Sequence, residues 1–165
     1  MFVGSMASAL HGPPRSTQDI DLVIALGRAD IARLVAAFPE DRYYISAEAV
    51  RDAVLRRGPF NVIDLESGWK ADLMVRKDRP FSVAELGRRQ HAEILGVSTW
   101  VATPEDTILS KLEWSALGGG SARQLDDVRG ILATQGGTLD LAYLDHWAGA
   151  LGVLDVWKAL QAQSG

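Results

Sequence analysis

The stretch Gly4–Asp21, with the sequence GSMASALHGPPRSTQDID, decides the fold of this chain. It begins with a Gly-Ser pair and ends with two acids two residues apart, which open a run of alternating acidic and aliphatic residues. Such alternation is typical of a half-buried strand, and side chains two residues apart on a strand point to the same face. Asp19 and Asp21 are therefore expected side by side, where their charges repel unless a cation lies between them.

Two carboxylates at this spacing suit Mg²⁺, a hard cation that proteins usually hold with carboxylates together with substrate phosphates. The Gly4-Ser5 turn upstream opens a short predicted helix at 5–11. Backbone N–H groups at a helix N-terminus attract phosphate. The residues alone thus predict a site for a divalent metal and a phosphate.

The combination of Gly4-Ser5 with the run at 15–21 (RSTQDID) resembles the nucleotidyltransferase superfamily, which has the DNA polymerase β-like fold. It is most similar to the minimal nucleotidyltransferases of bacterial toxin–antitoxin and abortive-infection systems, the AbiEii-like group. The resemblance implies transfer of a nucleotidyl group from a nucleoside triphosphate such as ATP to a hydroxyl of an RNA (for example a tRNA) or of a protein. It also implies two Mg²⁺ ions held by Asp19, Asp21 and a third carboxylate on a later strand.

The same resemblance assigns the triphosphate to residues from two parts of the chain. In the first part these are Gly4, Ser5, Arg15, Ser16 and Thr17. In the second part a helix lysine and an Arg-x-x-x-Asp on the next helix resemble later motifs of the group, and they are Lys111, Arg123 and Asp127 here. From the residues alone, Lys111 is equally a solvated lysine, Arg123 and Asp127 a surface pair, and Asp126 an alternative to Asp127.

Asp64 and Asp72 compete for the third carboxylate. The strands predicted on either side of residues 67–68 read as a hairpin, and a two-residue loop there would place Asp64 opposite Ala71. Opposed residues share a face, so the two acids fall on opposite faces and cannot both join one metal site. The segment 70–75, an acid inside an aliphatic strand, resembles the third motif of the family. We therefore predict Asp72 as the third metal ligand and as the general base.

Hydrophobic periodicity predicts an α/β (α+β) fold with two regions. Residues 1–102 are expected to form a nucleotidyltransferase-like core, a mixed twisted sheet flanked by helices. Residues 103–165 carry four helical patterns, which begin at a Thr-Pro helix start, and are expected to form a small bundle packed on that core. Strands are expected at 19–25, 60–65, 69–76 and 97–102, and further helices at 28–38 and 47–57.

Composition narrows the class of protein. The 165 residues are 47% hydrophobic and 23% charged, which are ordinary globular values, and a net charge of −4 gives no support for a general nucleic-acid binder. There is no cysteine to form a disulfide or a thiolate metal site, and no apolar run approaches the roughly 20 residues of a membrane span. We expect a cytoplasmic protein without membrane contact. The resemblance, and not the composition, implies that it binds a nucleoside triphosphate, an acceptor and a cognate toxin or antitoxin.

The first residues, Met1-Phe2-Val3, read as the end of a strand that leads into the Gly-Ser turn. The resembling family usually carries a longer strand and a helix at this point, so we expect that the chain either begins downstream of the natural start or is a short member of the family. The neighbour of such a stub is expected to be an exposed edge, which a second copy of the chain could cover as a homodimer. A second class of function stays open, a catalytically silent binding module that kept the fold.

Overall fold

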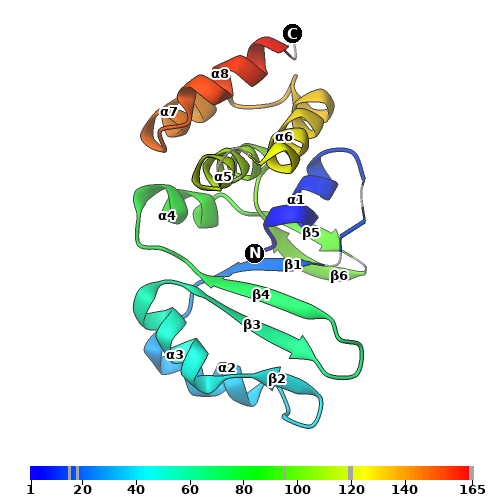
Figure 1. Cartoon of the computed structure of the whole chain (residues 1–165), viewed down its shortest axis with the longest axis vertical. Coiled ribbons are helices and arrows are strands. Elements are labelled where there is room, and N and C mark those ends of the chain that lie inside the picture. The colour runs from blue at the N-terminus through cyan, green and yellow to red at the C-terminus, as the bar shows by residue number, and fades with distance from the viewer. Residues whose placement is uncertain (15, 18, 95, 119–120, 164–165) are drawn as a thin grey trace.

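The computed structural model of this chain describes residues 1–14, 16–17, 19–94, 96–118 and 121–163. It has a mixed α/β fold, with helices on both faces of a four-stranded sheet of order β1-β4-β3-β2 and a run of helices at the C-terminal end (Figure 1). The strands are β1 (Ile20–Ile24), β2 (Tyr43–Ile45), β3 (Pro59–Asp64) and β4 (Lys70–Val75), with a separate hairpin of β5 (Gln90–Ile94) and β6 (Val97–Val101). The helices are α1 (Gly4–His11), the 3₁₀ turn η1 (Arg28–Asp30), α2 (Ile31–Ala36), α3 (Ala47–Arg56), α4 (Pro80–Gly87), α5 (Pro104–Leu117), α6 (Ala122–Gln135), α7 (Leu141–Ala150) and α8 (Leu154–Gln163).

The sheet is built around the parallel pair β1 and β4, which β3 and β2 extend in antiparallel order. Because side chains alternate along a strand, each strand of this pair has an apolar face and a polar one. Leu22 and Leu73 face one hydrophobic core, which α2 and α3 cover. Asp21 and Asp72 face the other way. Helices α1, α4 and α5 lie on that side of the sheet (Figure 1).

A second hydrophobic core fills the helical end of the molecule. It joins Phe81 of α4 to buried residues of α5, α6, α7 and α8, such as Ile108 and Trp157. Helix α5 begins as predicted, because the side chain of Thr103 accepts a hydrogen bond from the backbone of Asp106 and a proline occupies the first turn. None of the helices in the described part of the chain is long and apolar enough to span a membrane.

The stub Met1–Val3 is paired on both of its sides. The backbone N–H of Val3 donates to the carbonyl of Asp21 at 3.0 Å, and that of Phe2 donates to the carbonyl of Trp100 at 2.7 Å. The stub therefore lies between β1 and β6 and connects the two sheets. The prediction of an exposed edge here was wrong, because β6 supplies the missing partner, and this edge gives no reason for a second copy to bind.

Candidate functional site

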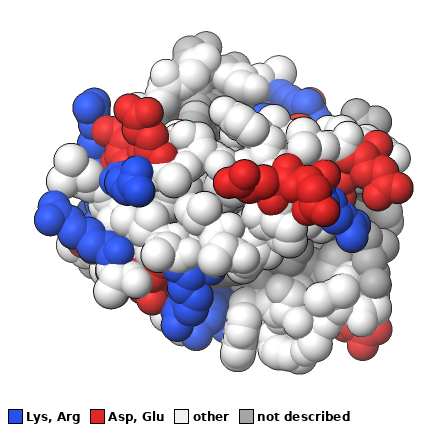
Figure 2. All heavy atoms as spheres, turned by 90° about the horizontal axis from the view of Figure 1, so that it is seen from below, with Lys and Arg blue, Asp and Glu red and all other residues white. Residues whose placement is uncertain are grey.

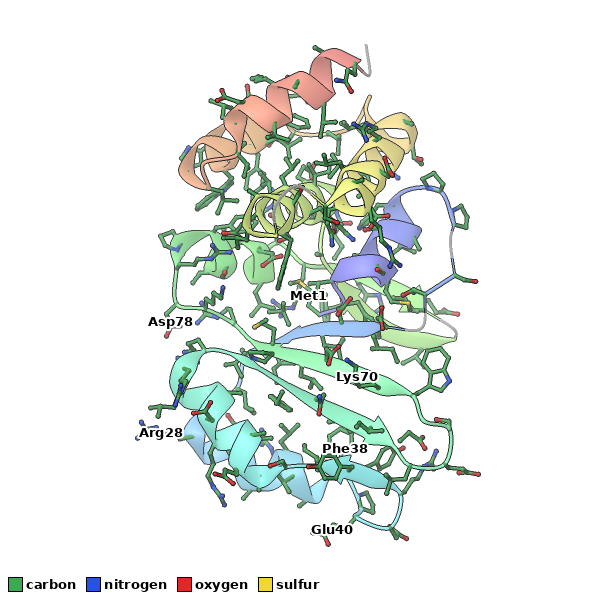
Figure 3. The ribbon with its side chains drawn as sticks, in the orientation of Figure 1. Met1, Arg28, Phe38, Glu40, Lys70 and Asp78 are labelled. Atoms are coloured by element: carbon green, nitrogen blue, oxygen red, sulfur yellow. The ribbon has the colours of Figure 1, made fainter. Side chains whose placement is uncertain are left out.

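A cavity of about 580 Å³ lies between the polar face of β1 and β4 and the helices α4 and α5. Asp21 and Asp72 lie on its floor, and Gly4 and Ser5 at the start of α1 contribute to its wall. In Figure 3, Lys70 lies at the start of β4 and Asp78 lies beyond the end of that strand. Lys70 forms an ion pair with Asp72 at the acidic end of the cavity, and Asp78 forms one with Arg76 at the other end.

The acidic end rests on the register of the two central strands. Asp21 pairs directly with Asp72 across parallel strands, so the two carboxylates point to the same face. Burial raises the pKa of Asp21, and the neighbouring charges of Asp72 and Asp19 raise it further. The backbone N–H of Ser5, which donates to the carboxylate of Asp21, and the charge of Lys111 act in the opposite direction.

The described residues of the segment before β1, 16–17 and 19, do not line the cavity. Asp19 is exposed, and its backbone N–H donates to the hydroxyl of Thr17 at 3.2 Å. Ser16 is exposed as well, and Arg15 lies outside the described residues. The charge of Asp19 still acts on Asp21, which agrees with their two-residue spacing.

The donors at the acidic end have the chemistry of a site for a hard divalent cation. All of them are carboxylate oxygens, and the repulsion that raises the pKa of Asp21 is of the kind that a cation relieves. Among the residues that the structure describes, however, no three Asp, Glu, His or Cys side chains are grouped closely enough to hold a metal ion in this conformation. The residues fit the cation by chemistry, and binding would require their side chains to converge further.

Lys70 is a charged residue of this end that sequence reasoning missed. Its ammonium lies 2.7 Å from a carboxylate oxygen of Asp72, and this hydrogen bond raises the pKa of Lys70. The carboxylates of Asp19 and Asp21 raise it further by their charge. The signal was present in the sequence, because Lys70 is two residues before Asp72 on one strand and must share its face. Lys70 thus serves as a built-in counter-charge for the acids.

Asp64 points away from the cavity, although its pairing differs from the predicted one. Ala71 pairs with Val62 and not with Asp64, because the loop contains four residues, 65–68. The prediction was wrong by two residues, and a slip of two keeps every side chain on its face, whereas a slip of one would exchange the faces. The carboxylate of Asp64 instead accepts the backbone N–H of Glu66 at 2.9 Å and stabilises the turn.

Lys111 and Asp127 form a buried ion pair between α5 and α6. Their charged groups are 2.5 Å apart, and the two side chains are only 6% and 9% exposed. Lys111 also lines the cavity. Of the two adjacent acids on α6, Asp127 therefore lies beside the lysine, while Asp126 pairs with Arg129 at the surface.

The opposite end of the cavity is basic. Its lining contains Arg57, Arg76, Lys77 and Arg79, together with Glu113, whose carboxylate accepts hydrogen bonds from the guanidinium of Arg79. Arg57 and Arg76 both form ion pairs with Asp78, at 2.8 and 3.0 Å. The Nη1 atom of Arg76 is buried and has no hydrogen-bond partner among the described residues, which is a costly state for a charged group.

Charge is distributed differently on the outer surface shown in Figure 2. On that face most Lys and Arg side chains lie on the left with Asp and Glu side chains among them, and a row of Asp and Glu side chains crosses the right half. Such a mixed face does not produce a strong field of one sign.

Glu85 of α4 is a buried acid in the wall of the cavity, only 6% exposed. Burial raises the pKa of Glu85 to about 7, against the lowering effect of the hydroxyl of Ser110, which donates to it at 2.9 Å. The neighbouring charges of Asp106 and Glu113 also raise this pKa, and that of Arg79 lowers it. Glu85 therefore changes its charge within the physiological range of pH.

Comparison with known proteins supports the fold. No protein-family profile matches the chain, and no curated protein matches its sequence. Among solved structures, it is similar to an antigenic nucleotidyltransferase-like protein from Paracoccidioides brasiliensis, with a TM-score of 0.54 and 19% sequence identity over 98% of this chain and 83% of that chain. At this identity the likeness shows the fold alone, and that fold is nucleotidyltransferase-like.

Replacing Gly4 tests how closely α1 approaches the acids. Gly4 has φ +59°, and a Cβ added to it would lie 2.2 Å from a carboxylate oxygen of Asp21. We expect Gly4→Ala to lower the free energy of unfolding, measured in urea, by more than the roughly 1–3 kcal/mol that a left-handed backbone costs a residue other than glycine. The matched control is Gly68→Ala, at φ +73° with nothing within 4 Å, which should show the backbone cost only. Equal losses in both variants would contradict the close approach.

Glu85 makes the stability of the protein depend on pH. Its pKa in the folded state, about 7, lies above the ordinary 4.5, so its contribution to stability is complete below pH 4.5 and is lost as the pH rises toward 7. We expect Glu85→Gln to remove this dependence and to raise the free energy of unfolding at pH 8 relative to wild type, by at most about 3 kcal/mol. Urea unfolding at pH 5 and pH 8 measures it. Glu48→Gln, an exposed acid on α3, is the control, and parallel profiles for wild type and Glu85→Gln would contradict the prediction.

Proposed function

We propose that this chain is a Mg²⁺-dependent nucleotidyltransferase that transfers a nucleotidyl group from a nucleoside triphosphate to a hydroxyl of an RNA acceptor. The observation that carries the proposal is the in-register pair Asp21 and Asp72 on the floor of a cavity, beside the N-terminus of α1. The nucleotidyltransferase-like fold supports it. The sequence motif at 15–21 also supports a role as a toxin or antitoxin with a cognate partner.

Each part of the acidic end has a role in this proposal. Asp19, Asp21 and Asp72 would hold two Mg²⁺ ions, which when bound neutralise phosphate charge and lower the pKa of the attacking hydroxyl. The oxygen of that hydroxyl attacks the α-phosphorus, the bond from the α-phosphorus to the bridging oxygen breaks, and pyrophosphate leaves. Asp72 accepts the proton of the hydroxyl as general base.

The triphosphate would lie at the N-terminus of α1. Gly4 and Ser5 offer backbone N–H groups and a hydroxyl there, which suit phosphate oxygens. Lys111, whose ammonium acts on Asp21 by charge, would add a compact positive charge. Ser16 and Thr17, in the connection that leads to β1, would assist.

The basic end supports RNA as the acceptor. Arg76 follows Asp72 by four residues, roughly 13 Å along an extended strand. This distance is longer than one triphosphate needs and suits further phosphates of a bound RNA. Arg57, Arg76, Lys77 and Arg79, which line the cavity at this end, would supply positive charge for such phosphates.

A second candidate is a silent binding module with the same fold. It is favoured by the ion pairs in which Lys70 and Lys111 already neutralise Asp72 and Asp127. Incubation with each labelled triphosphate, Mg²⁺ and cellular RNA or protein separates the two candidates. Labelled RNA supports the proposal, labelled protein corrects the acceptor, and absence of label with either acceptor favours the silent module.

Replacing Asp21 tests the acids within this assay. We expect Asp21→Asn to abolish Mg²⁺-dependent transfer, because it removes a ligand charge, and to leave the free energy of unfolding almost unchanged, because it also relieves repulsion. Asp64→Asn is the matched control, since an amide oxygen can still accept the turn hydrogen bonds, and it should transfer normally. Full transfer by Asp21→Asn would refute the assignment.

Neutralising the basic end tests the acceptor. We expect the double variant Arg76→Gln, Lys77→Gln to flatten the dependence of log affinity on log salt by about 1.4 for a short single-stranded RNA, since each neutralised phosphate contributes about 0.7. Fluorescence anisotropy of a labelled RNA measures this slope. The control is Arg51→Gln, Arg56→Gln, two exposed residues of α3 that do not line the cavity. The same slope in both double variants would argue against RNA at this end.

A further inference from the structure

Helix α5 exposes two large apolar side chains at the cavity, although a helix that packs on a core usually buries such side chains. Trp114 is 59% exposed and Leu117 is 74% exposed, and both line the cavity. The core side of the same helix is already filled by buried residues, among them Ile108 and Leu112. Trp114 and Leu117 are one helical turn apart, so they form a continuous apolar surface beside the cavity.

This surface continues the polar site. Lys111 precedes Trp114 by three residues, about 5 Å along the helix axis, and its charge reaches Asp21. The cavity thus presents carboxylates and an ammonium at one place and an exposed indole one turn further on. A ligand that matches both parts must carry phosphates at one end and a flat, weakly polar group at the other.

We propose that Trp114 is the stacking platform for the base of the nucleoside triphosphate. The inference deepens the proposed function, and it rests on the binding of a triphosphate at this site. The side chain of Trp114 is mostly exposed and lines the cavity, so its indole is accessible to a ligand there, and stacking on an aromatic side chain accepts any of the bases. Leu117 adds apolar area next to the indole. The subsite therefore strengthens binding of all four nucleotides without selecting one.

Two probes distinguish stacking from any other role of Trp114. A non-hydrolysable nucleoside triphosphate carries a base, and inorganic triphosphate carries the phosphates alone. We expect Trp114→Ala to weaken binding of the nucleotide roughly 5- to 100-fold in isothermal titration with Mg²⁺, the range that loss of one stacked base gives, and to leave binding of inorganic triphosphate unchanged. Trp114→Phe keeps an aromatic face and should restore most of the nucleotide affinity.

Tryptophan emission gives a second readout. The nucleotide should quench the emission of the wild-type protein, and this quenching should be largely lost in Trp114→Phe although the nucleotide still binds. Trp100→Ala is the control, because Trp100 is 44% exposed on β6 and does not line the cavity. It should change neither affinity.

The outcomes separate this inference from the proposed function. Nucleotide binding that is equal in wild type and Trp114→Ala overturns the stacking role and leaves the nucleotidyltransferase proposal intact. An equal loss of both probes in Trp114→Ala means that the residue only supports the structure, and it overturns the inference too. A wild-type protein that binds neither probe overturns both proposals.

Discussion

The parallel register of β1 and β4, which sets Asp21 beside Asp72, is the constraint on which the rest of the structure depends. Parallel strands cannot be joined by a tight turn, so a long crossover must connect them. Here the crossover contains α2, α3 and the antiparallel strands β2 and β3, and it builds the core beneath the sheet. The same register places two like charges on one face, and that repulsion must be offset by groups from elsewhere. They come from three different elements: the backbone of Ser5 on α1, Lys70 on β4 and Lys111 on α5.

Lys111 links this electrostatic requirement to the helical end of the molecule. Its ammonium is buried with Asp127 of α6 as partner, and removing one member of a buried pair leaves the other charge without compensation. Helices α5 and α6 must therefore keep their relative position for the site to keep its charge balance. Asp106 reinforces α5 from the other direction, because it is fully buried and accepts hydrogen bonds from Thr103 and from Tyr143 of α7. The C-terminal helices thus hold one wall of the cavity in place.

The alternation of side chains along a strand and the capping of a helix could be predicted from the sequence. Features that depend on tertiary neighbours could not. The face of Asp72 followed from alternation and survived a pairing error of two residues. The start of α5 followed from a Thr-Pro cap. Strand β2 has three residues and α4 has eight, which is too short for a clear period, and both were missed along with β5. The helix expected at 28–38 is a 3₁₀ turn followed by α2, which ends at Ala36. The partner of Met1–Val3 was not foreseen either, because only the folded chain brings β6 beside it.

One strand, β4, gives the cavity an acidic end and a basic end. Side chains at every second position of β4 and its continuation share a face, and these are Lys70, Asp72, Met74 and Arg76. Asp72 with its partner Lys70 lies at one end of this row, and Arg76, whose guanidinium forms an ion pair with Asp78, lies at the other, with the apolar Met74 between them. Oppositely charged groups separated by roughly 13 Å along a strand do not neutralise each other directly, since that separation exceeds a Debye length at physiological salt. Each end therefore keeps its own field, so that one cavity favours cations near Asp72 and anionic groups near Arg76. A single strand with charged residues at both ends of one face is therefore sufficient to give a cavity two ends of opposite charge.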